Sequence, residues 1–309
     1  MAVIIGPGSL NADITCFAPR LPRMGETVQG SLIRMGAGGK GNNQFTAAAR
    51  LGAEAYIIGC VGDDAQGDVL MSHVRREGIR TDYLDVITAS HSGSAFIEVQ
   101  ESDAQNRIIV CEGANACVDG ARVRTAEKGF AATDAVLAQL ETTTEAVLAA
   151  KRLAQAYGKP FILNPAPCVP LPDEMFTGTD YITPNETEAE ALTGISVRTD
   201  ADCRAAAEKL LYMGVKRVII TLGERGVYYY DGTREIRVPA LSVECRDTTG
   251  AGDAFNGALA TAIAEGRDIH YALRFATCVS ALCVTREGAA DSMPYRDEAL
   301  ALMKEAFGL

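Results

Sequence analysis

Two aspartates separated by small residues form the segment of the chain best suited to chemistry. Asp247–Asp253 reads DTTGAGD, and the apolar periodicity that follows predicts a helix over Ala254–Ala264. The backbone N–H groups of Gly250, Ala251 and Gly252 lie at the start of this helix, where N–H groups attract anions. Because these residues are small, a phosphate can come close to the backbone. Asp253 would repel a bound anion, but it can take a proton from a hydroxyl that attacks a phosphoryl group. The alternative is an acidic cap on an ordinary helix.

A second glycine-rich segment lies near the N-terminus. Gly36–Gln44 reads GAGGKGNNQ and precedes a helix that we expect over Asn43–Leu51. It matches G-x-G-x-x-G, so an NAD-dependent oxidoreductase is one alternative. Against it, Lys40 occupies the centre of the loop, two strand-like runs come before it, and Asp247–Asp253 would have no role. The chain has no Gly-Lys-Ser/Thr, which excludes a Walker-type loop.

The composition narrows the possible partners. The 309 residues carry a formal net charge of −11, which argues against nucleic acid or an anionic membrane as a partner. No apolar stretch is long enough to span a bilayer. Nine dispersed cysteines without a Cys-x-x-Cys pair indicate reduced thiols and a cytoplasmic protein. The three histidines lie outside every motif, so we expect no histidine-dependent catalysis.

Short β-branched runs alternate with longer helical ones along most of the chain. This pattern predicts one α/β domain over residues 1–309, with three layers and a mostly parallel central sheet. The expected strands are Ala2–Ile5, Ala55–Val61, Ala135–Leu140, Pro160–Leu163, Tyr181–Thr183 and Arg217–Leu222. The further expected helices are Asp64–Glu77, Thr144–Tyr157, Glu186–Thr193 and Asp200–Met213.

Two regions break the alternation, at about residues 12–36 and 93–112. They contain hairpin-like strands with polar turns, expected at Asp13–Phe17, Val28–Met35, Ser94–Gln100 and Arg107–Cys111. These strands could form a lid, or they could be edge hairpins without a function. Asn11, Glu141, Asn185 and Gly223 each follow a predicted strand. Ligands of an open parallel sheet bind beyond the carboxyl ends of its strands, so one crevice can gather these residues.

In this order and spacing the motifs resemble the ribokinase-like (PfkB) family of sugar and nucleoside kinases, across nearly the whole chain. The resemblance rests on both glycine-rich segments and on Asn11–Asp13, Leu140–Glu141, Asn164–Pro167, Thr183–Glu188, Thr221–Gly226 and Val284–Ala289. It implies an α/β/α fold with a small β-sheet lid, and ATP-dependent phosphorylation of D-ribose at O5. Another pentose, deoxyribose or a nucleoside is the alternative substrate, and a sugar-binding regulatory protein is the alternative from a different class.

The resemblance also assigns a sugar site. Asn11 and Asp13 flank a small residue, so in an extended segment both side chains point to one face. The family uses such positions for sugar hydroxyls, and here they are Asn11, Asp13, Gly39, Lys40, Asn43, Glu141 and Asp253, with lid contacts from Ala95 and Ile97. Without the resemblance, Asp13 could be a turn former, Lys40 a surface lysine and Glu141 a helix-start acid.

The nucleotide and metal positions follow from the resemblance as well. ATP would contact Asn185, Thr221, Gly223, Gly226, Gly252 and Thr277, and Glu188 would hold Mg²⁺ through water. Asn185 and Glu188 have the spacing of one helix face, which a capping pattern would also explain. Carbonyl-rich positions would hold K⁺ at Asp247, Thr249, Cys283, Arg286, Gly288 and Ser292. Thr277 and Glu112 depart from the family, which often has histidine and a small residue there.

The lid strands carry apolar residues at alternating positions, including Ile14, Cys16 and Ile33 in one part and Ala95, Ile97 and Val99 in the other. One face of a thin sheet can cover the sugar, but the other face and the edges stay uncovered. Lids pair in the family, so the resemblance implies a homodimer joined through the lid.

Overall fold

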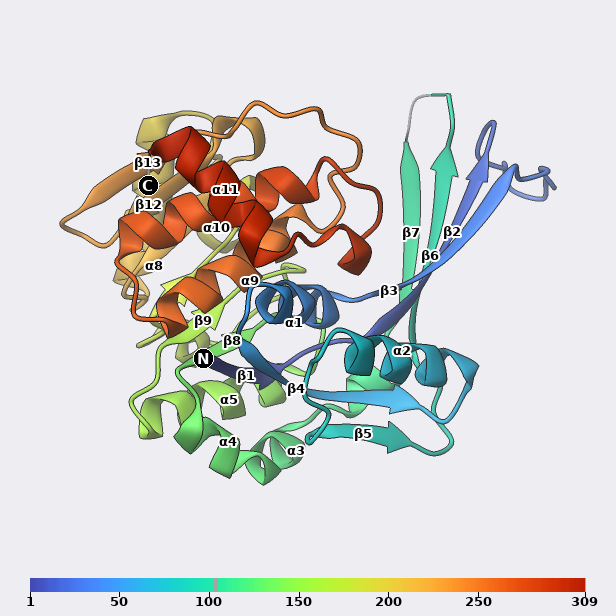
Figure 1. Cartoon of the computed structure of the whole chain (residues 1–309), viewed down its shortest axis with the longest axis horizontal. Helices are drawn as coiled ribbons and strands as arrows, with labels where there is room; N and C mark the ends of the chain where they lie inside the picture. Colours follow the sequence, from blue (N-terminus) through green and yellow to red (C-terminus); the bar gives the residue numbers. More distant parts are fainter. Residues whose placement is uncertain (103–104, 309) are drawn as a thin grey trace.

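A sheet of short apolar strands forms the centre of the chain. The computed structural model describes residues 1–102 and 105–308, and within them nine strands run in the order β13-β12-β11-β10-β9-β8-β1-β4-β5 (Figure 1). Neighbours pair in parallel from β5 to β11 and antiparallel between β11, β12 and β13. The strands are β1 Val3–Pro7, β4 Glu54–Gly62, β5 Leu84–Ile87, β8 Ala135–Ala138, β9 Phe161–Leu163, β10 Tyr181–Ile182, β11 Val218–Thr221, β12 Val227–Tyr230 and β13 Glu235–Val238.

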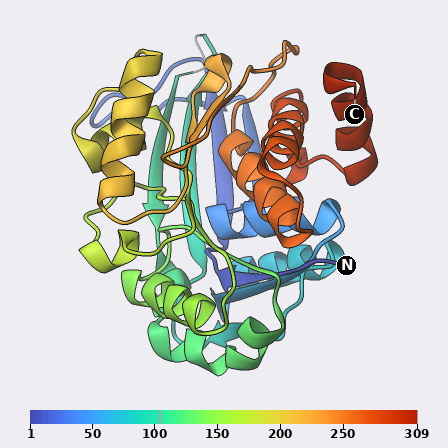
Figure 2. The same ribbon diagram turned by 90° about the vertical axis from the view of Figure 1, so that its left-hand side faces the viewer.

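Helices cover both faces of this sheet (Figure 2). One layer contains α1 Lys40–Arg50, α2 Ala65–Arg76, α9 Ala251–Ala264, α10 Ile269–Cys283 and α11 Arg296–Phe307. The other contains α3 Gly120–Thr125, α4 Glu127–Ala132, α5 Thr144–Ala156, α6 Asp173–Phe176, α7 Glu186–Thr193 and α8 Asp200–Tyr212. Successive strand residues point to opposite faces, so Ile4 packs in one core and Ile5 in the other, both fully buried. The predicted three-layer α/β/α fold is confirmed.

The elements expected from periodicity are all present, with ends that move by a few residues. The helix expected from Asn43 begins at Lys40, directly after Gly39, whose φ of 87° places it in the left-handed region that favours glycine. The helix expected from Ala254 begins at Ala251. No helix within the described residues is long and apolar enough to cross a membrane.

A separate four-stranded sheet projects from the body, in the order β3-β2-β6-β7 (Figure 1). Its strands are β2 Asn11–Ala18, β3 Leu32–Gly38, β6 Gly93–Gln100 and β7 Asn106–Cys111. We call this sheet the lid. It consists of two antiparallel hairpins joined where β2 and β6 pair in parallel.

The strand expected over Val28–Met35 is wrong at both ends. β3 begins at Leu32 and continues to Gly38, and residues 28–31 form no strand. Gly30 has no side chain to pack in a strand, and the amide of Ser31 donates to the Phe17 carbonyl at 2.9 Å to close the turn. The C-terminal extension of β3 places Gly38 directly opposite Asn11.

Helices α1 and α9 lie unusually close together, and a glycine makes this possible. A Cβ atom added at Gly257 would lie 2.5 Å from the Gln44 carbonyl oxygen and 2.7 Å from the Ala47 Cβ. Gly257 is one turn after Asp253, so the close approach brings the start of α9 against the start of α1. The contact therefore fixes the position of Asp253 relative to Asn43 and Gln44.

Replacing Gly257 by Ala tests this packing. Alanine in a helix is intrinsically favoured over glycine by about 1 kcal/mol, but the clash with backbone atoms of α1 should cost about 1–3 kcal/mol and outweigh it. We expect urea unfolding to show a net loss of stability. Gly36→Ala is the control, because a Cβ there would have no heavy atom within 4 Å, and a Gly257→Ala variant as stable as the wild type would contradict the prediction.

Candidate active site

Asp253 lies in the first turn of α9, behind a tight glycine turn. Gly250 caps the helix with a φ of 78°, a left-handed conformation that favours glycine. The Ala251 amide donates to the Thr248 carbonyl at 3.2 Å, so it is not free as the sequence suggested. Within the described residues, the amides of Gly250 and Gly252 have no acceptor. The turn therefore keeps two of the three expected anion-binding N–H groups.

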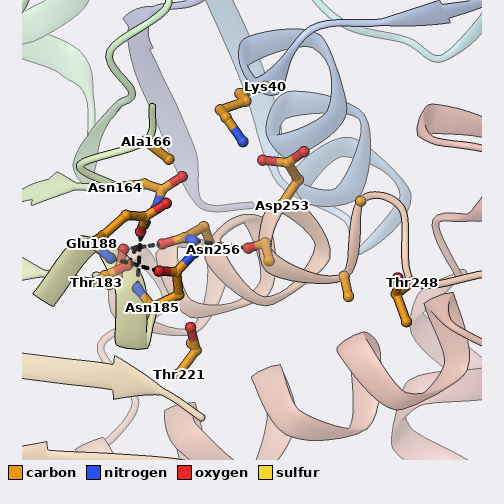
Figure 3. A pocket seen from close by; sticks show the side chains of 13 residues that line it. Lys40, Asn164, Ala166, Thr183, Asn185, Glu188, Thr221, Thr248, Asp253 and Asn256 are labelled. Atoms are coloured by element: carbon orange, nitrogen blue, oxygen red, sulfur yellow. Dashed lines mark hydrogen bonds between the residues drawn. The ribbon is translucent and has the colours of Figure 1, made fainter. Parts of the chain in front are cut away.

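The Asp253 carboxylate is buried and held by two amides. Its Oδ2 accepts from Asn43 Nδ2 and its Oδ1 from Gln44 Nε2, each at 2.9 Å. Lys40 points toward the same carboxylate (Figure 3). The negative charge of Asp253 raises the pKa of Lys40, with further contributions from Glu141 and Glu188 that together outweigh burial. The ammonium therefore stays charged beside the carboxylate.

A cluster of oxygen- and amide-bearing groups lies between this carboxylate and the lid. Glu141 Oε2 accepts from Ser9 Oγ at 2.6 Å and from the Lys40 amide at 2.9 Å. Asn11 Oδ1 accepts from Asn115 Nδ2 at 2.7 Å. These bonds leave Glu141 Oε1 and Asn11 Nδ2 as the atoms that can meet a ligand. Asn43 Oδ1 is buried and has no partner within the described residues, so it can accept from a hydroxyl.

Asp13 is the most perturbed carboxylate of the cluster. Burial raises its pKa from the usual 3.8 to about 7, with Glu141 and Asp253 adding repulsion. The carboxylate lies over Gly38, where an added Cβ would be 2.0 Å from Asp13 Oδ2. In the register of β2 and β6, Ala95 pairs directly with Asp13, and Ile97 is two residues further along the same face.

A cavity of about 230 Å³ opens beside Asp253 (Figure 3). Among the residues singled out in the sequence, it is lined by Lys40, Asn185, Glu188, Thr221, Gly250, Ala251, Gly252 and Asp253. Asn164, Ala166, Thr183, Thr248 and Asn256 also line it but were not assigned to the site. Asn164 and Thr183 directly follow β9 and β10, so their places at strand ends could have indicated them. Lys40 and Asp253 line the cavity and are also linked to the polar cluster, Lys40 through Glu141 and Asp253 through Asn43.

Asn185 and Glu188 lie at the start of α7, at the edge of the cavity. They form a capping box at the start of α7, in which Asn185 Oδ1 accepts from the Glu188 amide and Glu188 Oε2 from the Asn185 amide. Both also line the cavity. Burial raises the pKa of Glu188. Its second carboxylate oxygen remains available to a hydrated cation.

Three of the expected nucleotide positions do not line this cavity. Gly223 and Gly226 lie in the turn after β11, both with positive φ, and the Leu222 amide donates to the Gly226 carbonyl at 2.8 Å. Thr277 is buried inside α10, where its hydroxyl donates to the Leu273 carbonyl at 2.8 Å. Its polar group is therefore used within the helix.

The positions expected to hold a monovalent cation come together next to the glycine turn. Asp247 accepts from the Thr249 amide at 2.9 Å and from the Gly288 amide at 3.0 Å, which ties two loops together. The buried thiol of Cys283 lies 3.1 Å from Ser292 Oγ. Across residues 1–102 and 105–308, no group of three or more His, Cys, Asp and Glu side chains is arranged to hold a metal.

The fold and this site define a kinase of the α/β class with a lid, and comparison with known proteins identifies the family. The model of the pfkB family of carbohydrate kinases matches residues 3–296. The ribokinase of Haemophilus influenzae is 39% identical over 299 residues, which cover 97% of each chain. That of Bacillus subtilis is 40% identical over 291 residues, 94% of this chain and 96% of the relative. The Arabidopsis thaliana ribokinase structure with ribose and ATP superposes with a TM-score of 0.93 at 34% identity, over 98% of this chain and 99% of that one. The chain belongs to the pfkB family of carbohydrate kinases.

Family membership excludes the oxidoreductase alternative, and the structure explains the misleading motif. The glycine-rich segment begins within the last residues of β3, which pairs antiparallel with β2 in the lid. A dinucleotide-binding loop follows a parallel strand of the central sheet and opens a βαβ unit. The glycines instead allow close backbone contacts: a Cβ at Gly41 would lie 2.3 Å from the Gly8 Cα.

The raised pKa of Asp13 predicts a stability effect. Between about pH 4 and about pH 7 the folded protein holds the Asp13 proton while the unfolded chain has lost it, so this group lowers stability as pH rises through that window. Asp13→Asn should therefore gain stability relative to the wild type by on the order of 1–3 kcal/mol between about pH 5 and about pH 8. Urea unfolding of the sugar-free proteins measures this difference. A difference that stays constant with pH would contradict it.

Proposed function

We propose that this protein transfers the γ-phosphoryl group of ATP to O5 of D-ribose, giving D-ribose 5-phosphate and ADP. The observation that carries the proposal is the place of Asp253, which belongs both to a cluster of hydroxyl-binding groups and to a cavity that ends at a glycine turn. The matched relatives in H. influenzae and B. subtilis are ribokinases, and the Arabidopsis relative was solved with ribose and ATP. Free thiols at exposed Cys16 and Cys245 fit a cytoplasmic location.

In the proposed reaction, ribose lies under the lid with its hydroxyls against Asn11, Asp13, Gly39, Lys40, Asn43 and Glu141. Asp253 takes the proton of the O5 hydroxyl as that oxygen forms its bond to the γ-phosphorus. The bond from the γ-phosphorus to the bridging oxygen breaks, and ADP leaves with the electron pair. The amides of Gly250 and Gly252 face the charge that develops on the transferring group. Ala95 and Ile97 cover the sugar from the lid.

The nucleotide and the ions have defined places in this proposal. The triphosphate occupies the cavity next to Asn185 and Thr221, and the nucleoside extends past Gly223 and Gly226 toward α10, where Thr277 lies. Mg²⁺, when bound, would neutralise charge on the phosphates, and the free oxygen of Glu188 would hold one of its waters. K⁺ would be held between the two loops that Asp247 joins, by oxygens from Asp247, Thr249, Cys283, Arg286, Gly288 and Ser292. From there it would shape the glycine turn without contacting ATP.

A substrate panel with coupled detection of ADP tests this function. With Mg²⁺ and K⁺ present, we expect D-ribose to give the highest kcat/KM among D-ribose, 2-deoxyribose, other pentoses and a nucleoside. Asp253→Asn should keep sugar and ATP binding but lower turnover by roughly 10² or more, because the general base is lost.

Each alternative predicts a different result in the same assay. A higher kcat/KM for deoxyribose or a nucleoside would replace ribose as the substrate. Ribose binding without ADP formation would favour a regulatory sugar-binding protein. Near-normal turnover of Asp253→Asn would remove Asp253 from the role of base.

The lid supports a further part of the proposal, a homodimer. On the face opposite Asp13, cross-strand pairing places Met35, Ile14, Phe96 and Ile109 in one apolar row. Met35 is 68% exposed and Ile109 66%. The outer strands β3 and β7 also leave their edges without a partner in the described chain. An apolar face between two open edges suits pairing with a second lid.

Charges at the two ends of this row test the dimer. We expect light scattering at micromolar concentration to show a dimer for the wild type and a monomer for Met35→Lys/Ile109→Lys, because burying two ammonium groups costs several kcal/mol. Tyr212→Lys is the control, since Tyr212 is 92% exposed at the end of α8, away from the lid. A wild-type monomer, or a dimer that survives the double substitution, would contradict the prediction.

A further inference from the structure

We propose that Gln44 is a positioning residue for phosphoryl transfer, whose side-chain amide fixes the orientation of the Asp253 carboxylate. Gln44 is fully buried and does not line the cavity, so it touches neither phosphate nor solvent. The inference rests on the proposed role of Asp253 as the base. It adds a residue that acts on the reaction only through that base.

The hydrogen bonds of Gln44 allow its amide only one orientation. Nε2 donates both its hydrogens, one to Asp253 Oδ1 at 2.9 Å and one to Asn164 Oδ1 at 3.0 Å. Oε1 accepts from Gln139 Nε2 at 2.7 Å. A flipped amide would place Oε1 against two acceptor oxygens and Nε2 against a donor. The acceptor oxygens of Asp253 and Asn164 therefore set the orientation of Gln44, Gln139 adds a third hydrogen bond, and Gln44 holds one oxygen of the base.

The network continues through buried side chains and returns to the same turn of α9. Asn164 Nδ2 donates to the Thr183 carbonyl at 3.2 Å, and Thr183 Oγ1 donates to Asn256 Oδ1 at 2.6 Å. Asn256 Nδ2 then donates to the Gly252 carbonyl at 2.8 Å (Figure 3). Gly252 is the residue before Asp253. One hydrogen-bond network, from the end of β8 to the start of α9, thus holds both the base and the glycine turn.

Gln44 differs from the other groups that surround Asp253. Four charged or titratable side chains interact electrostatically with the Asp253 carboxylate. They are Lys40 on α1, Asp13 on β2, Glu188 on α7 and Cys283 on α10. Asn43, the second amide on the carboxylate, belongs to the proposed sugar site, so sugar binding changes its surroundings. Gln44 donates to the carboxylate from the buried side and is out of reach of the sugar. A neutral donor of this kind stabilises a carboxylate without repelling the incoming phosphoryl group.

Gln44→Met tests the proposal, because methionine has a similar length and no amide. We expect kcat to fall roughly 10- to 100-fold, the usual range for an outer partner of a functional group. KM for sugar and for ATP should stay within about twofold, since Gln44 contacts neither substrate. In an Asp253→Asn background the same substitution should cause no further loss, because Gln44 acts through Asp253.

Thr46→Val is the matched control on the same helix. Thr46 is fully buried, and its hydroxyl lies 3.3 Å from His73 Nε2 rather than in the Gln44 network. We expect its kcat to be near that of the wild type. Should Gln44→Met fail to fold, Gln139→Met decides, because it removes the hydrogen bond to Gln44 Oε1 and should lower kcat roughly threefold or more at unchanged KM.

The outcomes separate this inference from the proposed function. Full turnover of Asp253→Asn would overturn the role of the base itself. A slow Asp253→Asn together with a normal kcat for folded Gln44→Met, or for Gln139→Met where that variant decides, would overturn only the role of Gln44. An equal loss in Thr46→Val, or a further loss in the double variant, would show a general effect of disturbing α1 and would also overturn it.

Discussion

A buried carboxylate must be compensated by hydrogen bonds or opposite charge, because an isolated ion loses several kcal/mol of hydration. Asp253 meets this requirement with two neutral amides and one ammonium group, all from the first turns of α1. The two helices must therefore approach closely, and Gly257 makes the approach possible. The same approach determines the rest of the site, because Lys40 and Asp253 then belong to both the sugar cluster and the cavity.

The central sheet supplies the other half of the site through its carboxyl edge. Asn164, Thr183 and Thr221 stand at or just beyond the ends of three successive parallel strands, and all three line the cavity. Polar groups gather there because the strands themselves are apolar on both faces and pack in two separate cores. Only the base of one face of the lid contacts the site, so the outer residues of the lid remain exposed.

The sequence predicted the fold and many of the residues that line the cavity, but not the buried residues that hold them in place. The period of the apolar residues was enough to predict the α/β alternation and the lid hairpins. The spacing of small residues and aspartates was enough to single out Asp253. Helices α10 and α11 were not among the predicted elements. Gln44 and Asn256 were missed because an amide at a buried position has no sequence signature until its partners are known, and those partners are 120 and 73 residues away. For Thr277 the sequence indicated the matching position in the family. It could not show that the Thr277 hydroxyl donates a hydrogen bond inside α10.

Strand β2 couples the sugar site to assembly through its period of two. Asn11 and Asp13 face the site, while Ile14 lies between Met35 and Phe96 in the apolar row on the opposite face. A shift of β2 by one residue would exchange these two sets, placing an isoleucine against the sugar and a carboxylate in the exposed row. The Asn115 bond to Asn11 and the pairing of Asn11 with Gly38 oppose such a shift from the body side. Contact between two lids would oppose it from the outer face, so a dimer would hold the hydroxyl-binding carboxylate in register as well as cover the apolar row.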